Sequence, residues 1–194
     1  MTVQAVSIEP AAITAIVLCG GRGSRMGGRD KPLLEYRDRP IVAHVVDALT
    51  GSVVSVLISA NRNEQRYRRY GTVVADELTD HGPLSGIASC LKHCTTPYAF
   101  VCPGDAPHLD PIVIQRLGHE LISSDAMAAA ARDDDQRQNL HVLVRANLSS
   151  DIDVYLASGA RSVTSWLDRI GAVDVDCSDI AESFVDFDDP EDFE

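Results

Sequence analysis

A glycine-rich, basic stretch near the start of the chain carries the residues best suited to chemistry. Residues 18–31 read LCGGRGSRMGGRDK and hold five glycines, three arginines and one lysine. Glycine loses more backbone entropy on ordering than any other residue, so a stretch this rich in glycine does not build core. It lets the backbone approach a ligand closely, and the basic side chains indicate that this ligand is an anion.

The stretch fits neither of two familiar phosphate-binding patterns. In the Walker pattern a Ser or Thr follows the lysine, but here Lys31 is followed by Pro32. The dinucleotide fingerprint G-x-G-x-x-G fails at its third glycine, where Met26 stands, and residues 33–36 read as extended chain rather than as a helix. We therefore interpret the stretch as an open cradle in which backbone N–H groups, Arg25 and Lys31 hold a polyphosphate.

Two aspartates follow predicted strands and are candidates for a site beside a polyphosphate. Mg²⁺ accompanies polyphosphates and prefers one or two carboxylates together with phosphate oxygens. Asp105 lies in the stiff sequence PGDAP, which suits metal binding, although a turn or helix-capping aspartate fits the same pattern. Asp76 fits a surface turn equally well, and His81 and His108, in the same loops, are interpreted as solvent-facing.

Strands and helices that alternate along the chain must position these residues. Short apolar runs predict strands over 13–18, 53–59, 72–75, 98–102, 126–131, 140–144, 172–176 and 184–187. Amphipathic spacing predicts helices over 40–49, 63–70, 84–94, 111–121, 150–157 and 162–170.

This alternation is typical of a single α/β domain with a largely parallel sheet. The domain is expected to cover 13–194, after an N-terminal extension over 1–12. Ligands of such sheets bind beyond the carboxyl ends of the strands. We therefore expect the glycine-rich stretch, Asp76 and Asp105 to converge on one crevice.

The composition narrows the class of protein further. The 194-residue chain has a net charge of −12, which disfavours non-specific binding to nucleic acid. No apolar run is long enough to span a bilayer, and the first twelve residues lack the basic and apolar regions of a secretory signal. We therefore expect a cytoplasmic protein. From Asp174 onward the chain has ten acidic residues and no basic one. We interpret this end as a solvated tail that packs through Phe184, Phe187 and Phe193, rather than as a second metal site.

The five cysteines do not form a zinc-binding pattern. Their number is odd and no two are spaced as CxxC. Cys90 and Cys94 flank His93 at helical spacing, and we interpret them as small core residues rather than as metal ligands. Cys19 and Cys102 are likewise interpreted as packing residues in a reducing compartment.

The glycine-rich stretch resembles that of the molybdenum cofactor guanylyltransferases, a family of the nucleotidyltransferase superfamily. The family pattern is L-A-G-G-x-x-x-R-M-G-G-x-D-K, and this chain departs from it only at Cys19. The resemblance extends from Ile13 to about Arg116. Four further blocks belong to it, namely Asn61–Arg62, Asp76, GPLSG at 82–86 and PGDAP at 103–107.

The resemblance implies a fold, an activity and a set of roles. The fold would be a single-domain, Rossmann-like three-layer α/β/α nucleotidyltransferase fold. The activity would be transfer of GMP from GTP to Mo-molybdopterin with release of pyrophosphate, dependent on Mg²⁺. The implied roles place the nucleotide along Leu18, Cys19, Gly20, Gly21, Asn61 and Asp76, the triphosphate at Arg25 and Lys31, and the magnesium ion at Asp105.

The same resemblance implies that GTP and Mo-molybdopterin are the substrates, and we expect the protein to be a monomer. Contact with cofactor-biosynthesis or molybdoenzyme-maturation proteins would be transient, and neither nucleic acid nor membrane would be a partner.

Three departures from the family pattern fall outside the stretch. Asp186 and Asp188 replace two asparagines of the last block, Gln138–Asn139 replaces a His-Pro pair, and Ser59 replaces an asparagine. The first two concern the region expected to receive the pterin. Two alternatives therefore stay open. One is a nucleotidyltransferase for another base or acceptor, such as CTP or a sugar phosphate, and the other is a non-catalytic nucleotide-binding relative.

Overall fold

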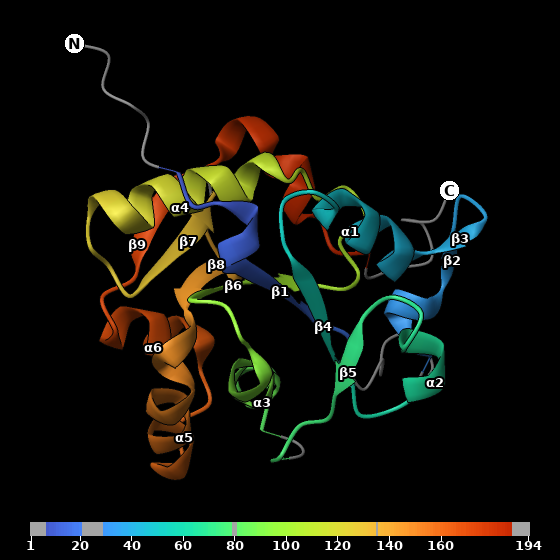
Figure 1. The fold of residues 1–194 in the computed structure, drawn as a ribbon, viewed down its shortest axis with the longest axis horizontal. Coiled ribbons are helices and arrows are strands. Elements are labelled where there is room, and N and C mark those ends of the chain that lie inside the picture. The colour runs from blue at the N-terminus through green and yellow to red at the C-terminus, as the bar shows by residue number, and fades with distance from the viewer. Residues whose placement is uncertain (1–6, 21–28, 79–80, 135, 188–194) are drawn as a thin grey trace.

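A seven-stranded sheet forms the centre of the computed structural model, which describes residues 7–20, 29–78, 81–134 and 136–187. The strand order is β5-β4-β1-β6-β8-β7-β9 (Figure 1). The strands are β1 (Ile13–Leu18), β4 (Ser55–Ser59), β5 (Thr72–Val74), β6 (Tyr98–Pro103), β7 (Ala128–Arg132), β8 (Arg137–Arg145) and β9 (Val173–Asp176). Only β8 runs antiparallel to its neighbours, β6 and β7, and the other pairings of this sheet are parallel.

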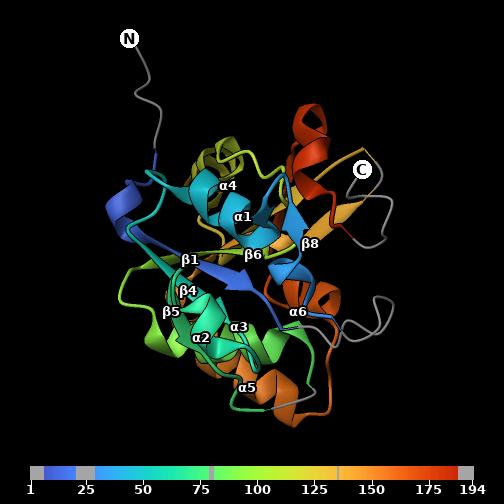
Figure 2. The ribbon, with the colours of Figure 1, turned by 90° about the vertical axis from the view of Figure 1, so that its right-hand side faces the viewer.

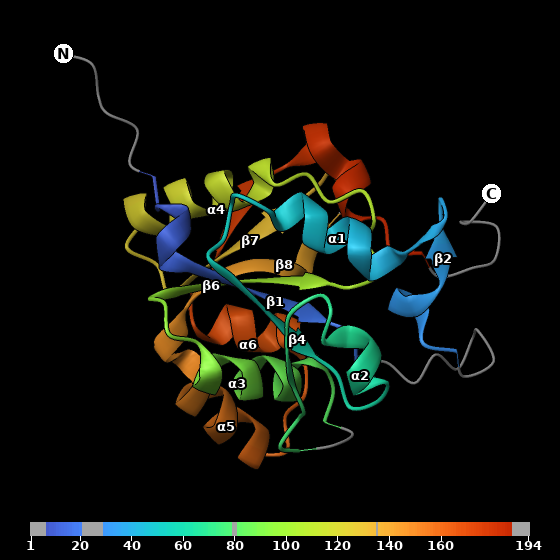
Figure 3. The same ribbon diagram turned by 45° about the vertical axis from the view of Figure 1, so that its right-hand side comes forward.

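Helices cover both faces of the sheet and make three layers (Figures 2 and 3). One face carries α1 (Ile41–Leu49), α4 (Ile112–Ser123) and the 3-10 helix η5 (Ser178–Phe184). The other face carries α3 (Pro83–His93), α5 (Ser149–Ala157) and α6 (Val163–Arg169). The short helix α2 (Glu64–Tyr67) lies between β4 and β5 in the chain. Smaller elements are the hairpin β2 (Glu35–Tyr36) and β3 (Arg39–Pro40), and the 3-10 helices η1 (Pro10–Ala12), η3 (Lys31–Leu33) and η4 (Ala146–Leu148).

The core consists of two apolar clusters, one on each face of the sheet. Ala15 and Val17 of β1 face the cluster that holds Tyr67, whereas Ile16 faces the cluster that holds Trp166. Because helices cover both faces, β1 reads as a continuous apolar run instead of an alternating one. Across the described residues, no helix combines the length and apolar character needed to cross a membrane.

The fold class predicted from the sequence is confirmed, as are most of the predicted elements. The segment 184–187 is an exception, because Phe184 ends η5 and residues 185–187 are not a strand. Its two phenylalanines, three residues apart, pack on different rings, Phe184 against His141 and Phe187 against Tyr36. The prediction of extended chain over 33–36 is also wrong at Leu33, which belongs to η3, a helix that Pro32 can enter at its first turn.

Candidate active site

A cleft of about 420 Å³ opens at the carboxyl ends of β1, β4, β5 and β6. Six of the residues predicted from the sequence line it: Leu18, Cys19, Gly20, Lys31, Asp76 and Asp105. The expected convergence on one crevice is therefore confirmed for these residues, whereas their roles stay predictions. Gly21 and Arg25, which were predicted with them, lie outside the described residues.

Backbone hydrogen bonds extend the sheet past the end of β1 and hold the start of the glycine-rich stretch. The Cys19 N–H donates to the Ser59 carbonyl at 2.8 Å, and the Gly104 N–H donates to the Leu18 carbonyl at 2.9 Å. Gly104 has to be a glycine, because a Cβ there would lie 2.6 Å from the Cys19 sulfur and 3.1 Å from the Leu18 carbonyl oxygen. The three strand ends are thus packed too closely for a side chain between them.

Asp76 is fixed at the mouth of the cleft by two side chains from the end of β4. The Ser59 hydroxyl donates to Asp76 Oδ1 at 3.1 Å, and the Asp76 N–H donates to Asn61 Oδ1 at 2.8 Å. Asn61 therefore orients Asp76 instead of lining the cleft itself. The first turn of α3 closes over this group at Gly86, where a Cβ would lie only 2.2 Å from the Ser59 hydroxyl oxygen.

Asp105 lines the same cleft as Asp186, an acid that sequence reasoning did not assign to the site. The two are brought together because the Phe187 N–H donates to the Asp105 carbonyl at 2.9 Å. The Phe187 ring is buried and packs edge-on against the ring of Tyr36, with 4.8 Å between centroids. Burial, and then the Asp105 and Asp186 carboxylates, raise the pKa of the neighbouring Cys102 thiol.

The helix-capping alternative for Asp105 belongs to another residue. Asp110 accepts the N–H of Ile112 on its Oδ1 at 2.9 Å, at the start of α4. The histidine of the same loop, His108, is exposed, as expected, but its ring also packs against Tyr36 and Phe187. Asp105 itself lies in a turn, as the other alternative predicted, and it also lines the cleft.

The thiols near the cleft are packing residues, as the sequence indicated. Cys19 is only 1% exposed, and burial, followed by Asp30 and Asp105, raises its pKa well above the usual value. Burial likewise raises the pKa of Cys90 to about 12, with Asp76 as the next cause. Both thiols are therefore protonated near neutral pH and are poor nucleophiles. Among the residues that the structure describes, no three His, Cys, Asp or Glu side chains are grouped to hold a metal ion.

Several residues of the cleft were missed by sequence reasoning. Ser59 ends a predicted strand at the correct edge, so the rule that selected Asp76 and Asp105 would also have found it. Leu140 lies near the start of β8, which reaches this edge only because β8 runs antiparallel. Arg62 and Asp30 line the cleft as well, and no signal in the sequence shows that they contact each other.

A mostly parallel sheet with a cleft at its carboxyl edge, lined by a lysine and several carboxylates, defines an α/β protein with a charged site at its strand ends. The sequence matches the family described as "MobA-like NTP transferase domain" over residues 15–172. The chain belongs to this family.

Its relatives include curated proteins named molybdenum cofactor guanylyltransferase. The one from Shewanella loihica is 34% identical over 181 residues, which is 92% of each chain. The one from Vibrio campbellii is 31% identical over 185 residues, which is 95% of this chain and 94% of the relative. Among solved structures, molybdopterin-guanine dinucleotide biosynthesis protein A from Archaeoglobus fulgidus has the same fold, with a TM-score of 0.77 at 19% identity over 93% of this chain and 94% of that one.

Proposed function

We propose that this protein is a molybdenum cofactor guanylyltransferase, which transfers GMP from GTP to Mo-molybdopterin and releases pyrophosphate. The observation that carries the proposal is the meeting of Lys31, Asp76 and Asp105 in one cleft of a chain that is 34% identical to a protein of that name.

The reaction needs positioning and charge neutralisation more than it needs a protein nucleophile. An oxygen of the terminal phosphate of molybdopterin attacks the α-phosphorus of GTP. A new P–O bond forms, the bond to the bridging oxygen breaks, and pyrophosphate leaves with the electron pair. The attacking phosphate is already ionised at neutral pH, so no strong base is required. Lys31 and Arg25 would neutralise the charge that develops on the leaving group.

The acidic side of the cleft fits Mg²⁺. Asp105 and Asp186 both line the cleft, and oxygen atoms of one or two carboxylates are the protein ligands that Mg²⁺ usually takes beside phosphate. Asp105 would hold the ion, and the ion, when bound, would neutralise phosphate oxygens and act as a Lewis acid. Leu18, Cys19 and Gly20 would lie along the nucleotide, with Asp76 oriented toward it by Ser59 and Asn61.

The test is to compare the four nucleoside triphosphates with Mg²⁺ in a thermal-shift titration, and then to measure pyrophosphate release in the presence of Mo-molybdopterin. GTP should raise the melting temperature, and pyrophosphate should appear only when both substrates are present. A shift with CTP but not with GTP would overturn the choice of base. Tight binding of GTP without turnover would favour a non-catalytic relative.

A different acceptor is the second candidate, because Asp186 lines the cleft and departs from the asparagine of the family pattern that the chain resembles. The same assay with a sugar phosphate in place of Mo-molybdopterin distinguishes the two acceptors.

We also propose that the protein is a cytoplasmic monomer that contacts maturation proteins only transiently. Its five cysteines are free thiols, which is consistent with a reducing compartment.

A further inference from the structure

Asp30 precedes Lys31 at the end of the glycine-rich stretch and is buried, although aspartate is seldom buried unless it is paired. Both of its carboxylate oxygens accept hydrogen bonds from the segment 62–67, which begins more than thirty residues later in the chain. The Tyr67 hydroxyl donates to Oδ1 at 2.6 Å, and the Asn63 side-chain amide donates to Oδ2 at 2.8 Å. Arg62 Nε lies 3.7 Å from Oδ2.

The donors are themselves fixed. The Tyr67 ring is fully buried in the core, and burial, followed by the Cys19 thiol and Asp30, raises the pKa of Tyr67, so its hydroxyl keeps its proton near neutral pH. Asn63 has a φ of 53°, in the left-handed region that asparagine enters more readily than most residues. The segment 62–67 is therefore a rigid support for the carboxylate of Asp30.

The same segment also holds the backbone on both sides of Lys31. Arg62 Nη2 donates to the Arg29 carbonyl at 3.3 Å, and Arg66 Nη2 reaches the Leu33 carbonyl at 3.5 Å. Within the turn, the Leu33 N–H donates to the Asp30 carbonyl at 3.0 Å. Segment 62–67 therefore contacts the chain on both sides of Lys31, at residues 29–30 before it and at Leu33 after it. Lys31 itself lines the cleft.

We propose that Asp30, held by Tyr67 and Asn63, is a positioning residue that sets the place of the Lys31 ammonium group against the phosphates of the nucleotide. The inference rests on the proposed function, because it takes the cleft to bind a nucleoside triphosphate. A buried carboxylate costs desolvation free energy and adds little stability compared with a well-packed apolar group. Hydrogen bonds to the Asp30 carboxylate do fix the orientation of the turn that carries it, which a contact between apolar groups does not.

The test is a double-mutant cycle on nucleotide affinity in the full-length protein. Tyr67→Phe removes one hydroxyl and leaves the buried ring, and Lys31→Ala removes the ammonium group. In the wild-type background Tyr67→Phe should weaken GTP binding about tenfold, the size of one hydrogen bond to a charged group. In the Lys31→Ala background it should weaken GTP binding less than twofold. Tyr70→Phe is the matched control, and it should change neither value.

GMP gives a readout that a merely structural role would not produce. Because Lys31 would contact the phosphates that GMP lacks, Tyr67→Phe should leave GMP affinity within twofold of the wild type. Asn63→Gly keeps the left-handed backbone and removes the other donor to Asp30, so it repeats the test if the first variant does not fold.

Each other outcome has a distinct meaning. If Tyr67→Phe weakens GTP binding by the same factor in both backgrounds, or weakens GMP binding as much as GTP binding, Asp30 does not act through Lys31. If Lys31→Ala leaves GTP affinity unchanged, the positioning role is overturned as well. If the wild-type protein binds no nucleoside triphosphate, it is the proposed function that fails.

Discussion

The two walls of the cleft are built in different ways. The near wall lies at the ends of β1, β4 and β5, and the far wall lies at the end of β6, the start of β8 and the segment after η5. The near wall is Gly20, Lys31 and Asp76, and the far wall is Asp105, Leu140 and Asp186.

Side-chain hydrogen bonds hold the near wall. Tyr67 holds the turn of Lys31 through Asp30, and Ser59 holds Asp76. In the far wall the Phe187 N–H donates to the Asp105 backbone carbonyl, and the Phe187 ring packs against Tyr36. A backbone hydrogen bond can form whatever side chains its two residues carry. The hydrogen bonds of the near wall depend on particular side chains. Departures from the family pattern occur on both walls, at Ser59 beside Asp76 and at Asp186 in the lining with Asp105.

The largest expected effect comes from breaking the chemistry of the far wall. Asp105→Ala should lower pyrophosphate release by at least about 100-fold, because a Lewis-acidic metal ion is worth several kcal/mol of transition-state stabilisation. Steady-state turnover with GTP and Mo-molybdopterin measures it.

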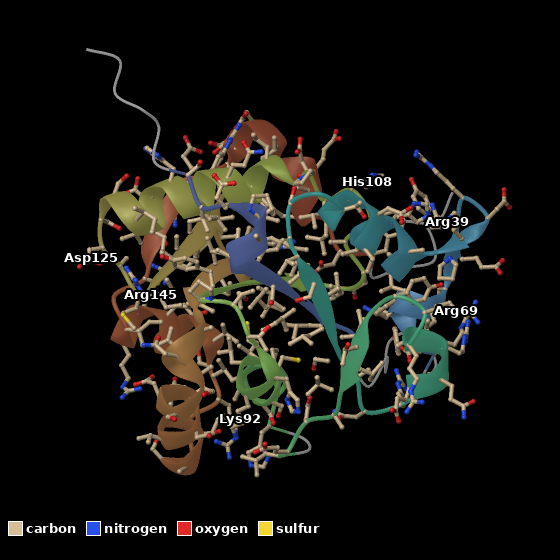
Figure 4. The ribbon with its side chains drawn as sticks, viewed as in Figure 1. Arg39, Arg69, Lys92, His108, Asp125 and Arg145 are labelled. Carbon is tan, nitrogen blue, oxygen red and sulfur yellow. The ribbon has the colours of Figure 1, made fainter. Side chains whose placement is uncertain are left out.

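Asp125→Ala is the control for this prediction. Asp125 pairs with Arg145 at 2.9 Å, on the opposite side of the molecule from Arg39 and Arg69 in Figure 4. Full turnover of the Asp105→Ala variant would show that Asp105 does not hold the metal ion.

The near wall should not tolerate even one added methyl group. In Gly86→Ala the new Cβ would lie 2.2 Å from the Ser59 hydroxyl oxygen and 3.1 Å from Asp76 Oδ1. Overpacking of this kind costs about 1–3 kcal/mol, which should appear in GTP affinity and in the melting temperature.

Ser59→Gly in the same chain should restore part of that loss, because it removes the hydroxyl that the methyl group meets. Gly118→Ala in α4 is the matched helical control, since its Cβ would meet nothing closer than 3.5 Å. Equal losses in the Gly86 and Gly118 variants would mean that the near wall is not tightly packed.

Acid should destabilise the region behind the far wall through His141. This residue of β8 is 2% exposed, packs against Phe184 and has no hydrogen-bond partner on Nε2. Burial lowers its pKa to about 3, so the unfolded chain takes up a proton near pH 6.5 that the folded chain does not. Between pH 7.5 and 5.5 the wild-type protein should therefore lose about 1.4 kcal/mol more stability than His141→Leu.

Urea unfolding of both proteins at the two pH values measures the difference, in which the other titrating groups cancel. Parallel pH profiles would show that His141 is protonated as readily in the folded protein as in the unfolded chain.

The smallest effect should separate the two walls. Phe187→Leu keeps an apolar side chain but loses the ring contacts with Tyr36 and His108, which are worth about 1 kcal/mol in all. The KM for Mo-molybdopterin should rise several-fold while the Kd for GTP stays unchanged. If GTP binding weakens by the same factor, a change in the far wall also alters the near wall, and the two walls do not act separately.

The sequence predicted the parts of this site that depend on local pattern. Strand β1 is a buried apolar run, and Asp76 and Asp105 were found because each follows a strand whose end lies at the same edge. The hydrogen bonds that hold Asp30 could not be predicted, because the Tyr67 donor lies on α2, which meets Asp30 only in the folded chain. The strand predicted over 184–187 is wrong because a short run with two aromatic residues looks the same whether it pairs with a sheet or packs on other rings.

The reversed direction of β8 has a consequence for how this cleft can change over evolutionary time. Because β7 and β8 are antiparallel, the hairpin turn between Arg132 and Arg137 lies at the same edge of the sheet as the cleft. Loops of this kind accept insertions and deletions more readily than the elements they join. A longer turn at this place would add residues at the edge of the sheet where the cleft lies, and it would leave β1, β4 and β6 unchanged.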